Sequence, residues 1–475
     1  MRDAVNGPRE DSRPNILKCR DDNRPVILLA KTAEAAGAAA PKFLLEKGSP
    51  CTWAKSEEEI DSGKLRTRIE PWLTALCQSE HLSLLLGSGL SQAVHRLGTG
   101  EQPPGMAAVS FGDEDGLVNK EAERTAEASG RGKGNIEDQI RVVNELLRGL
   151  EILGANDGKT QKRAAALRTK LEEVLAGFAA SILGGERGLI AADEGKRERA
   201  FNYLVSFLMS FASRTGTRER LHIFTTNYDR FIEAGAEVAG LHLLDRFVGS
   251  LAPIFRSSRL DLDIHYNPPG IRGEPRYLEG VARFTKLHGS VDWVDSERDI
   301  RRIGIPFGAT DIAPYLDPSG KGEMDAMQLM IYPNAAKDRE TSVHPYVELF
   351  RDFAASVCRP NHTLIAFGYG FGDDHINRVI EDMLTIPSTP PCPKTYLNPK
   401  SLFLKGLWCE YGAPQPTGKG RIRPHEPSFR TPGIPRCCRG RLGQPGPAES
   451  GRLPARREPN PGEATARQED PIDRR

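Results

Sequence analysis

The sequence predicts an α/β fold built on an open sheet, and three observations support that class. Short apolar runs of strand length recur along the chain and end in glycine or small polar residues. Most of these tips lead into a segment with the periodicity of an amphipathic helix. One run, Leu82 to Leu86, is continuously apolar, as expected of a strand buried on both faces. Ligands in such folds bind just beyond the carboxyl ends of the strands, so the tips are the candidate site.

Length and composition limit the possible organisation. A chain of 475 residues predicts two to three domains, and a hydrophobic content of 38% indicates that part of it has no core. The formal net charge of +1 implies no strong field for nucleic acid or an anionic membrane surface. No apolar run approaches the roughly 18 residues of a membrane helix, and the polar N-terminus lacks the apolar region of a signal peptide. None of the eight cysteines forms a CxxC pair, so we expect a reducing, cytoplasmic setting.

The chain before Leu82 falls into two parts. Residues 1–55 show no clean period and are expected to be a weakly structured lead-in. Residues 56–80 are expected to be a helix, because Ile69, Trp72 and Leu73 follow the spacing of one buried helical face.

A long helical insertion is expected between two strands of the sheet, over residues 135–214. It follows residues 99–134, which are rich in Gly, Glu and Ala and are expected to form an excursion or mobile loop. Asn135 is the expected cap of the first helix. The two other helices are expected at roughly 160–183 and 198–214.

The first strand-end motif is GSGLS, directly after Leu86. Gly87, Ser88 and Gly89 end the apolar run, and glycines there let backbone N–H groups approach a phosphate in front of a helix N-terminus. Ser91 is placed to add a hydroxyl donor. The alternative is a tight turn in which glycine supplies a positive φ.

The second motif is TTNYD, which follows the apolar run 221–224. Thr226, Asn227 and Asp229 lie at the tip, ahead of a helical pattern that starts near Phe231. The alternative to a catalytic loop is a simple connection in which Asn or Asp caps the following helix.

The third motif, LHGS, places His288 at the end of a short strand over 284–287 and before Gly289. A histidine here is a candidate catalytic residue, although a single histidine is often only a structural group. Beyond it, residues 327–333 are expected to be a strand and residues 343–357 an amphipathic helix.

The fourth motif, FGYGFGDDH, follows a strand expected over residues 363–367. Gly368, Gly370 and Phe371 lie in the turn, and a helix is expected from Asp373 with an aspartate as its cap. Glycines at a strand end before a helix suit the close approach of a nucleotide.

The four motifs taken together resemble the sirtuin superfamily. GSGLS stands in place of GAG-x-S, TTNYD in place of TQN-x-D, and LHGS in place of the catalytic HG. More narrowly, the chain resembles the sirtuin-like NADases of bacterial antiphage defence, and most of all the sirtuin subunit paired with a HerA-type ATPase. The resemblance covers about residues 65–385. It implies a Rossmann-like parallel sheet of sirtuin type within a domain of residues 56–385.

The resemblance also implies a role for each motif residue. Asn227 would bind near the nicotinamide ribose and place water or the acceptor, Asp229 would lie close to the carboxamide, and His288 would be the general base. The remaining residues would bind the rest of NAD: Gly87, Ser88, Gly89 and Ser91 at the pyrophosphate, Thr226 beside Asn227, and Gly368, Gly370 and Phe371 at the adenosine.

The implied activity is NAD+ glycohydrolysis, with NAD as substrate and nicotinamide and ADP-ribose as products, depleting NAD in antiphage defence. The resemblance further implies a homo-oligomer and a HerA-type ATPase partner. Two departures favour hydrolysis over protein deacylation. The four-cysteine zinc module is missing, because Cys358 is the only cysteine between His288 and Asp374, and QAVHRLG stands where deacylases carry a Pro-Asp-Phe-Arg run. We therefore expect no metal. A non-catalytic NAD-binding sensor subunit and a deacylase are the alternatives.

The composition changes abruptly over residues 386–475. This segment holds 17 of the 35 prolines, 4 of the 8 cysteines and 12 arginines, but no valine. It shows no helical or strand period, so we expect it to be disordered. Disordered tails seldom favour Cys and Trp, and this composition is more typical of GC-rich DNA read in the wrong frame. We therefore hypothesise a frameshift near Thr389.

Overall fold

A computed structural model of the chain describes most residues between Asn15 and Ile386. The tail predicted over 386–475 lies outside the described residues, apart from Ile386. The described ranges are 15–19, 22, 24–31, 42–55, 58–128, 133–214, 219–258, 262–266, 276–296, 299–316, 326–330 and 344–386.

A five-stranded parallel sheet forms the centre of the fold, in the order β14-β4-β5-β11-β6. Every neighbouring pair is parallel, and the apolar run of the first motif becomes the second strand from one edge. This sheet fits the Rossmann-like α/β fold that the sequence predicts. Its strands are β4 (His81–Leu86), β5 (His222–Thr225), β6 (His242–Leu244), β11 (Val281–Lys286) and β14 (His362–Phe367).

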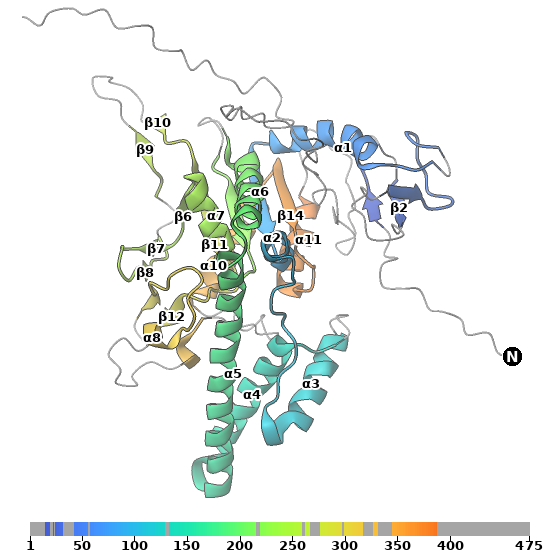
Figure 1. Cartoon of the computed structure of the whole chain (residues 1–475). Helices are drawn as coiled ribbons and strands as arrows, with labels where there is room; N and C mark the ends of the chain where they lie inside the picture. Colours follow the sequence, from blue (N-terminus) through green and yellow to red (C-terminus); the bar gives the residue numbers. More distant parts are fainter. Residues whose placement is uncertain are drawn as a thin grey trace, which may run out of the picture. The chain divides into compact units, whose positions relative to one another are not determined.

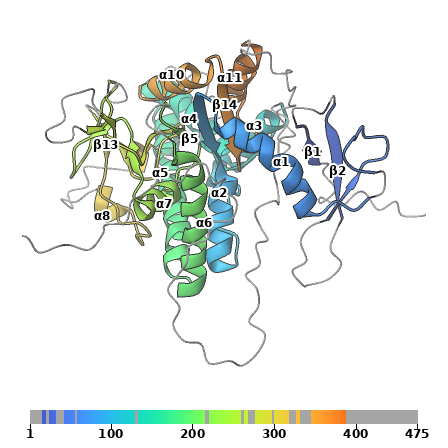
Figure 2. The same cartoon turned by 90° about the horizontal axis from the view of Figure 1, so that it is seen from above.

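Helices cover both faces of this sheet, and the alternation of side chains along β4 shows how. Leu84 and Leu86 pack in one hydrophobic cluster with residues of α2, α6 and α7, whereas Leu85 packs in another with residues of α10 and α11. Figure 2 shows the strands between these two helical layers. The helices are α2 (Ser88–Thr99), α6 (Glu194–Ala212), α7 (Phe231–Ala239), α10 (Tyr346–Val357) and α11 (Asp374–Thr385).

The predicted helical insertion is present, with different bounds. Asn135 caps its first helix in a reciprocal capping box with Asp138. The second helix is much longer than expected: its 33 residues span about 50 Å, and it is the longest ribbon in Figure 1. The insertion contains α4 (Ile136–Leu153), η2 (Gly154–Asn156), α5 (Gly158–Ile190) and α6.

The loop expected over residues 99–134 is wrong in its second half. Residues 112–114 form the 3₁₀ turn η1 (Gly112–Glu114), and α3 (Asp115–Ala128) follows. Val118, Ala122 and Ala126 recur every four residues and are buried against the insertion. Two of these three side chains are alanine, so the buried face is weak in hydrophobicity although its spacing is helical.

The weakly structured lead-in is also corrected. Its described part contains an antiparallel sheet of β1 (Asn15–Leu17), β2 (Val26–Lys31) and β3 (Lys42–Leu45). Val26 and Phe43 pack there against Leu65 of α1 (Ser62–Cys77). The core of this sheet is thus completed by residues beyond position 55, which local periodicity cannot reveal.

Among the described residues, short strands, one short helix and one 3₁₀ turn lie between α7 and α10, besides the sheet strands β6 and β11. The strand expected over 327–333 is not formed in its described part, which holds a 3₁₀ turn and a single bridge between Leu329 and Val294; residues 331–333 lie outside the described residues. The short elements are β7 (Phe247–Val248), β8 (Ile254–Phe255), β9 (His265–Tyr266), β10 (Arg276–Tyr277), β12 (Trp293–Asp295), β13 (Ile300–Arg302), α8 (Ala313–Leu316) and η4 (Ala326–Gln328).

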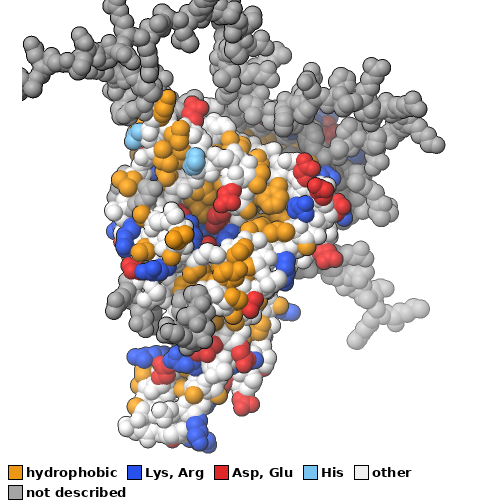
Figure 3. All heavy atoms as spheres, turned by 60° about the vertical axis from the view of Figure 1, so that its left-hand side comes forward, with side chains coloured by type: hydrophobic (Ala, Val, Ile, Leu, Met, Phe, Trp, Pro, Cys, Tyr) orange, Lys and Arg blue, Asp and Glu red, His pale blue; other side chains and the backbone are white. Residues whose placement is uncertain are grey.

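Two general features of the described residues concern apolar helices and surface charge. No single helix among them is long and apolar enough to cross a membrane, and α5 and α6 pass such a test only as a pair bent by 110°. Lys and Arg side chains lie among Asp and Glu side chains on the face drawn in Figure 3, as the near-zero net charge implies.

A buried ion pair joins the end of α5 to the start of α7. The guanidinium of Arg230 donates to both carboxylate oxygens of Glu186, at 3.1 and 2.6 Å. The same carboxylate also accepts the backbone N–H groups of Arg230 and Gly308. The Glu186 side chain has no exposed surface, and burial raises its pKa above the ordinary value. These hydrogen bonds offset the free-energy cost of burying the Glu186 carboxylate.

We expect Glu186→Ala to lower the free energy of unfolding by about 3–5 kcal/mol, because it leaves the Arg230 guanidinium buried without its counter-charge. Urea denaturation measures this. The control is Glu121→Ala, which removes an exposed pair with Arg124 on α3 and should cost less than about 1 kcal/mol. Equal losses in the two variants would contradict the assignment.

A histidine cluster at the amino ends of the strands predicts a pH dependence of stability. Burial, and then the charge of His81, lower the pKa of His362 from 6.5 to about 4. Between these values the unfolded chain binds a proton that the folded chain does not. The free energy of unfolding should therefore fall as the pH drops from 6.5 to 4. Urea titrations across this range should show a smaller slope for His362→Gln, and an unchanged slope would count against this origin.

Candidate functional site

The register of the sheet brings all four motifs to one edge. Leu86 pairs with Phe367 on one side and Thr225 on the other, and Thr225 pairs with Lys286. These four residues are the last of their strands, and the strands are parallel. The segments that follow them therefore leave the sheet side by side, at the edge where α/β folds bind ligands.

The first and fourth motifs are in backbone contact. The N–H groups of Gly87 and Gly89 donate to the carbonyl oxygens of Phe367 and Gly368, at 3.0 and 2.9 Å. A Cβ at Gly87 would lie 2.5 Å from the Gly368 oxygen, so this contact requires glycine. Gly87 has a φ of −110°, so a left-handed turn is not the reason for glycine there, whereas Gly368 does have a positive φ of 65°.

This contact changes the interpretation of the predicted phosphate cradle. The N–H groups of Gly87 and Gly89, expected to meet a pyrophosphate, are bonded within the protein in this structure. Ser88 is the exposed first residue of the 12-residue helix α2. An anion at this end of the sheet would therefore meet the start of α2 at Ser88.

Asn227 lies at the junction of the first and second motifs. Its amide nitrogen donates to the Gly87 carbonyl at 3.0 Å and to the Ser91 hydroxyl at 2.9 Å. Because a carbonyl can only accept, these bonds define which side of the amide is nitrogen. The Asn227 side-chain oxygen is buried and has no hydrogen-bond partner among the residues that the structure describes. A buried acceptor without a donor is unfavourable, and a ligand hydroxyl or water would satisfy it.

Hydrogen bonds also hold Thr226 and Asp229, the neighbours of Asn227 in the second motif. The Thr226 N–H donates to the Leu86 carbonyl at 3.2 Å. Asp229 accepts the Phe231 N–H at 3.2 Å. Burial raises the pKa of the Asp229 carboxyl, against the opposing charge of Lys286. Ser91 thus links the first motif to Asn227 of the second.

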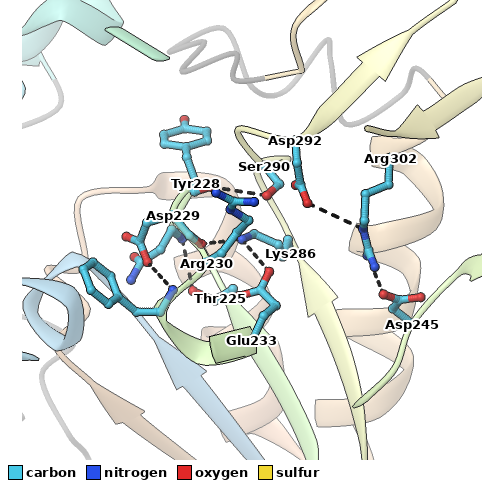
Figure 4. A network of polar contacts seen from close by, with 12 residues as sticks. Thr225, Tyr228, Asp229, Arg230, Glu233, Asp245, Lys286, Ser290, Asp292 and Arg302 are labelled. Atoms are coloured by element: carbon cyan, nitrogen blue, oxygen red, sulfur yellow. Dashed lines mark hydrogen bonds and ion pairs between the residues drawn. The ribbon is translucent and has the colours of Figure 1, made fainter. Parts of the chain in front are cut away.

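Lys286 anchors the second motif from within the sheet. Its side chain is 1% exposed, and its ammonium donates to the Asp229 carbonyl at 2.5 Å and to Glu233 of α7 at 2.9 Å. Figure 4 shows the ammonium between these two acceptors, with Asp292 and Arg302 in a second polar cluster nearby. Burial raises the pKa of Glu233, and the Lys286 charge opposes that rise.

His288 is buried and paired with a second histidine. Its Nε2 lies 3.3 Å from Nε2 of His375, the second residue of α11. Gly289, with a φ of 89°, follows it, and a Cβ there would lie 2.0 Å from the Met330 oxygen. Tyr228 flanks the His288 ring at 6.4 Å between centroids. The third motif therefore holds its histidine in a fixed backbone environment.

The fourth motif contains packed residues and one exposed glycine. Phe371 adopts a positive φ of 53°, packs edge-on against the Tyr369 ring, and its carbonyl accepts from Asn377. Gly370 is exposed, and a Cβ there would meet no atom within 4 Å. Close packing therefore explains Gly368 but does not explain Gly370.

Sequence reasoning missed three residues that the structure adds to this region: His375, Lys286 and Tyr228. Lys286 directly precedes LHGS, so its place next to the third motif can be seen in the sequence. His375 lies in the fourth motif, but its meeting with His288 depends on packing of α11 against the sheet.

Within the described ranges, no group of three or more His, Cys, Asp or Glu gathers in a way that could hold a metal ion. None of the four described cysteines, Cys19, Cys51, Cys77 and Cys358, forms a disulfide within the described part of the chain.

Part of the chain, including three of the four motifs, matches a known family model. Residues 221–397 match the SIR2-like domain. The match includes the second, third and fourth motifs and extends past the last described residue. The first motif precedes it in the chain, but β4 pairs between β14 and β5 of the SIR2-like region. The match supports the sirtuin-like resemblance and fits an NAD-dependent activity in general. No curated protein matches the chain significantly.

The glycine contact between the first and fourth motifs predicts a stability difference. We expect Gly87→Ala to lower the free energy of unfolding by about 1–3 kcal/mol, because the added methyl would overlap the Gly368 carbonyl. Gly370→Ala is the matched control and should change it by less than about 0.5 kcal/mol. Urea denaturation of both variants is the measurement. Similar free energies of unfolding for the two variants would contradict the importance of the close contact between Gly87 and Gly368.

Proposed function

We propose that the SIR2-like region hydrolyses NAD+ to nicotinamide and ADP-ribose, with Asn227 and His288 as catalytic residues. The observation that carries the proposal is their equivalent position on neighbouring strands. Thr225 and Lys286 are paired across β5 and β11, and each catalytic residue lies two positions further along. Neighbouring strands are about 4.8 Å apart, which supports a single site reached by both side chains.

Asn227 supports this proposal through its unpaired oxygen. With the amide nitrogen committed to Gly87 and Ser91, the oxygen is oriented by the protein before a ligand binds. Such an acceptor suits a ribose hydroxyl or the attacking water. A fixed acceptor reduces the reorganisation needed when positive charge develops on the ribose.

The chemistry needs few further groups. Hydrolysis breaks the bond between the ribose and the pyridinium nitrogen, and its electron pair returns to the ring, so the leaving group needs no general acid. The water oxygen bonds to the ribose carbon, and one proton is released. His288 would take that proton.

The same residues would also bind NAD without cleaving it, as in a sensor subunit, and a deacylase would use NAD with an acylated lysine. Product analysis with NAD alone separates these functions. Nicotinamide and ADP-ribose formed without a peptide support the hydrolase. Binding without products supports the sensor, and products formed only with an acyl peptide support the deacylase.

We also propose, from the resemblance alone, that the activity serves antiphage defence within a homo-oligomer joined by a HerA-type ATPase. Free NAD hydrolysis is harmful to a cell, so restraint by an assembly is expected. Affinity purification from the native host tests this, and failure to recover an ATPase would contradict the pairing.

We expect Asn227→Ala and His288→Ala each to lower the turnover of NAD by at least about 100-fold, because each removes a group that acts on the reacting atoms. Released nicotinamide is the measurement. Asn202→Ala and His242→Ala are matched controls, since both residues are exposed and lie on α6 and β6. Unchanged turnover in either test variant, with the fold confirmed by urea denaturation, would remove that residue from the mechanism.

A further inference from the structure

The second histidine at the strand edge has no assigned role. We propose that His375 is a positioning residue for His288, and that a hydrogen bond between their Nε2 atoms selects the tautomer of His288. The role in turnover rests on the proposed function, because it takes His288 as the base. The hydrogen bond itself does not depend on that function.

The geometry of the pair restricts where protons can lie. The two Nε2 atoms are 3.3 Å apart, and the side chains belong to residues that are 5% and 9% exposed. A neutral imidazole has one donor nitrogen and one acceptor nitrogen. A favourable contact therefore requires a proton on one Nε2 and a lone pair on the other.

Only one of the two arrangements leaves His288 able to act as a base. If His288 donates its Nε2–H to His375, its Nδ1 carries the lone pair that accepts a proton. If His375 donates instead, the neutral His288 must carry its proton on Nδ1, and the base is lost. Catalysis by His288 thus needs His375 as an acceptor, in the way that a partner on one ring nitrogen sets the role of the other.

Packing keeps the two rings in this relation. Phe350 of α10 contacts the His375 ring edge-on at 4.8 Å between centroids, and the two imidazole rings are 5.4 Å apart. Gly289 has no room for a side chain beside Met330, so the backbone after His288 is also constrained. The pair is therefore held from α10, α11 and the end of β11.

A shared metal ion is the competing explanation of the short separation. Two imidazole nitrogens bound to one zinc ion at about 2.0–2.1 Å would lie about 3.3 Å apart. Structural zinc sites use four protein ligands and catalytic sites three. Around this pair, the described residues supply no third His, Cys, Asp or Glu in reach of such an ion. The shared proton requires only the two groups present.

Two substitutions at His375 separate its hydrogen bond from its packing. His375→Phe keeps an aromatic ring against Phe350 but removes the acceptor, so we expect kcat to fall about 100-fold with KM changed less than about threefold. His375→Gln keeps an amide that can accept, and should recover kcat to within about tenfold of the parent protein. His242→Gln, at an exposed histidine, is the control and should retain full activity.

A spectroscopic readout tests the pair without turnover. Long-range proton–nitrogen NMR correlations of the histidine-labelled full chain report each tautomer, and the signal lost in His288→Gln assigns His288. We expect His288 as the Nε2–H tautomer in the parent protein and in His375→Gln, and as a mixture in His375→Phe. If His375→Phe does not fold, His375→Asn, whose amide is too short to reach, takes its place.

Different outcomes test the positioning role of His375 and the proposed hydrolysis of NAD. An unchanged tautomer in His375→Phe, or unchanged kcat, would overturn the positioning role even if the protein hydrolyses NAD. One equivalent of zinc in the parent protein, lost in His375→Phe, would also overturn it. If the parent protein does not hydrolyse NAD, the proposed function fails, and the NMR result alone decides whether the hydrogen bond selects the tautomer.

Discussion

The parallel pairing of β4 between β14 and β5 is the constraint on which the candidate site depends. It places the ends of four strands in one row, and the glycine contacts between the first and fourth motifs then close that row. A shift of one residue in β4 would turn Leu84 and Leu86 to the opposite helical layer. The hydrophobic layers on both faces of the sheet therefore determine where Asn227 and His288 lie.

Buried polar groups fix the loops that the strands end in. The Lys286 ammonium holds the Asp229 carbonyl, and Glu186 holds the backbone N–H of Arg230. Burying such charges is unfavourable unless each is paired and hydrogen-bonded, as these are. What the fold gains is a second motif with little freedom to move, which is what preorganised catalysis requires.

Sequence alone was sufficient for the parts of the fold with strong local patterns. Leu82 to Leu86, the capped helix at Asn135 and the four strand tips lie where the pattern predicts. Patterns failed where long-range packing decides the structure. The β1–β3 sheet needs Leu65 from α1, and α3 is buried largely through alanines. The pairing of His375 with His288 joins residues 87 positions apart, so no local spacing could indicate it.

The helical insertion shares a hydrophobic core with Tyr228 of the second motif and with Val291, just beyond the third motif. The Tyr228 ring packs edge-on against Phe178 of α5, and its hydroxyl donates to Glu137 near the start of α4 at 3.3 Å. The Tyr228 carbonyl in turn accepts the backbone N–H of Val291, just beyond the third motif. Tyr228 lies between Asn227 and Asp229 in the chain. A displacement of α4 or α5 must therefore strain the residue that separates the two polar side chains of the second motif. The insertion and the second motif therefore share packing and a hydrogen bond at Tyr228, even though the sequence separates them into different segments.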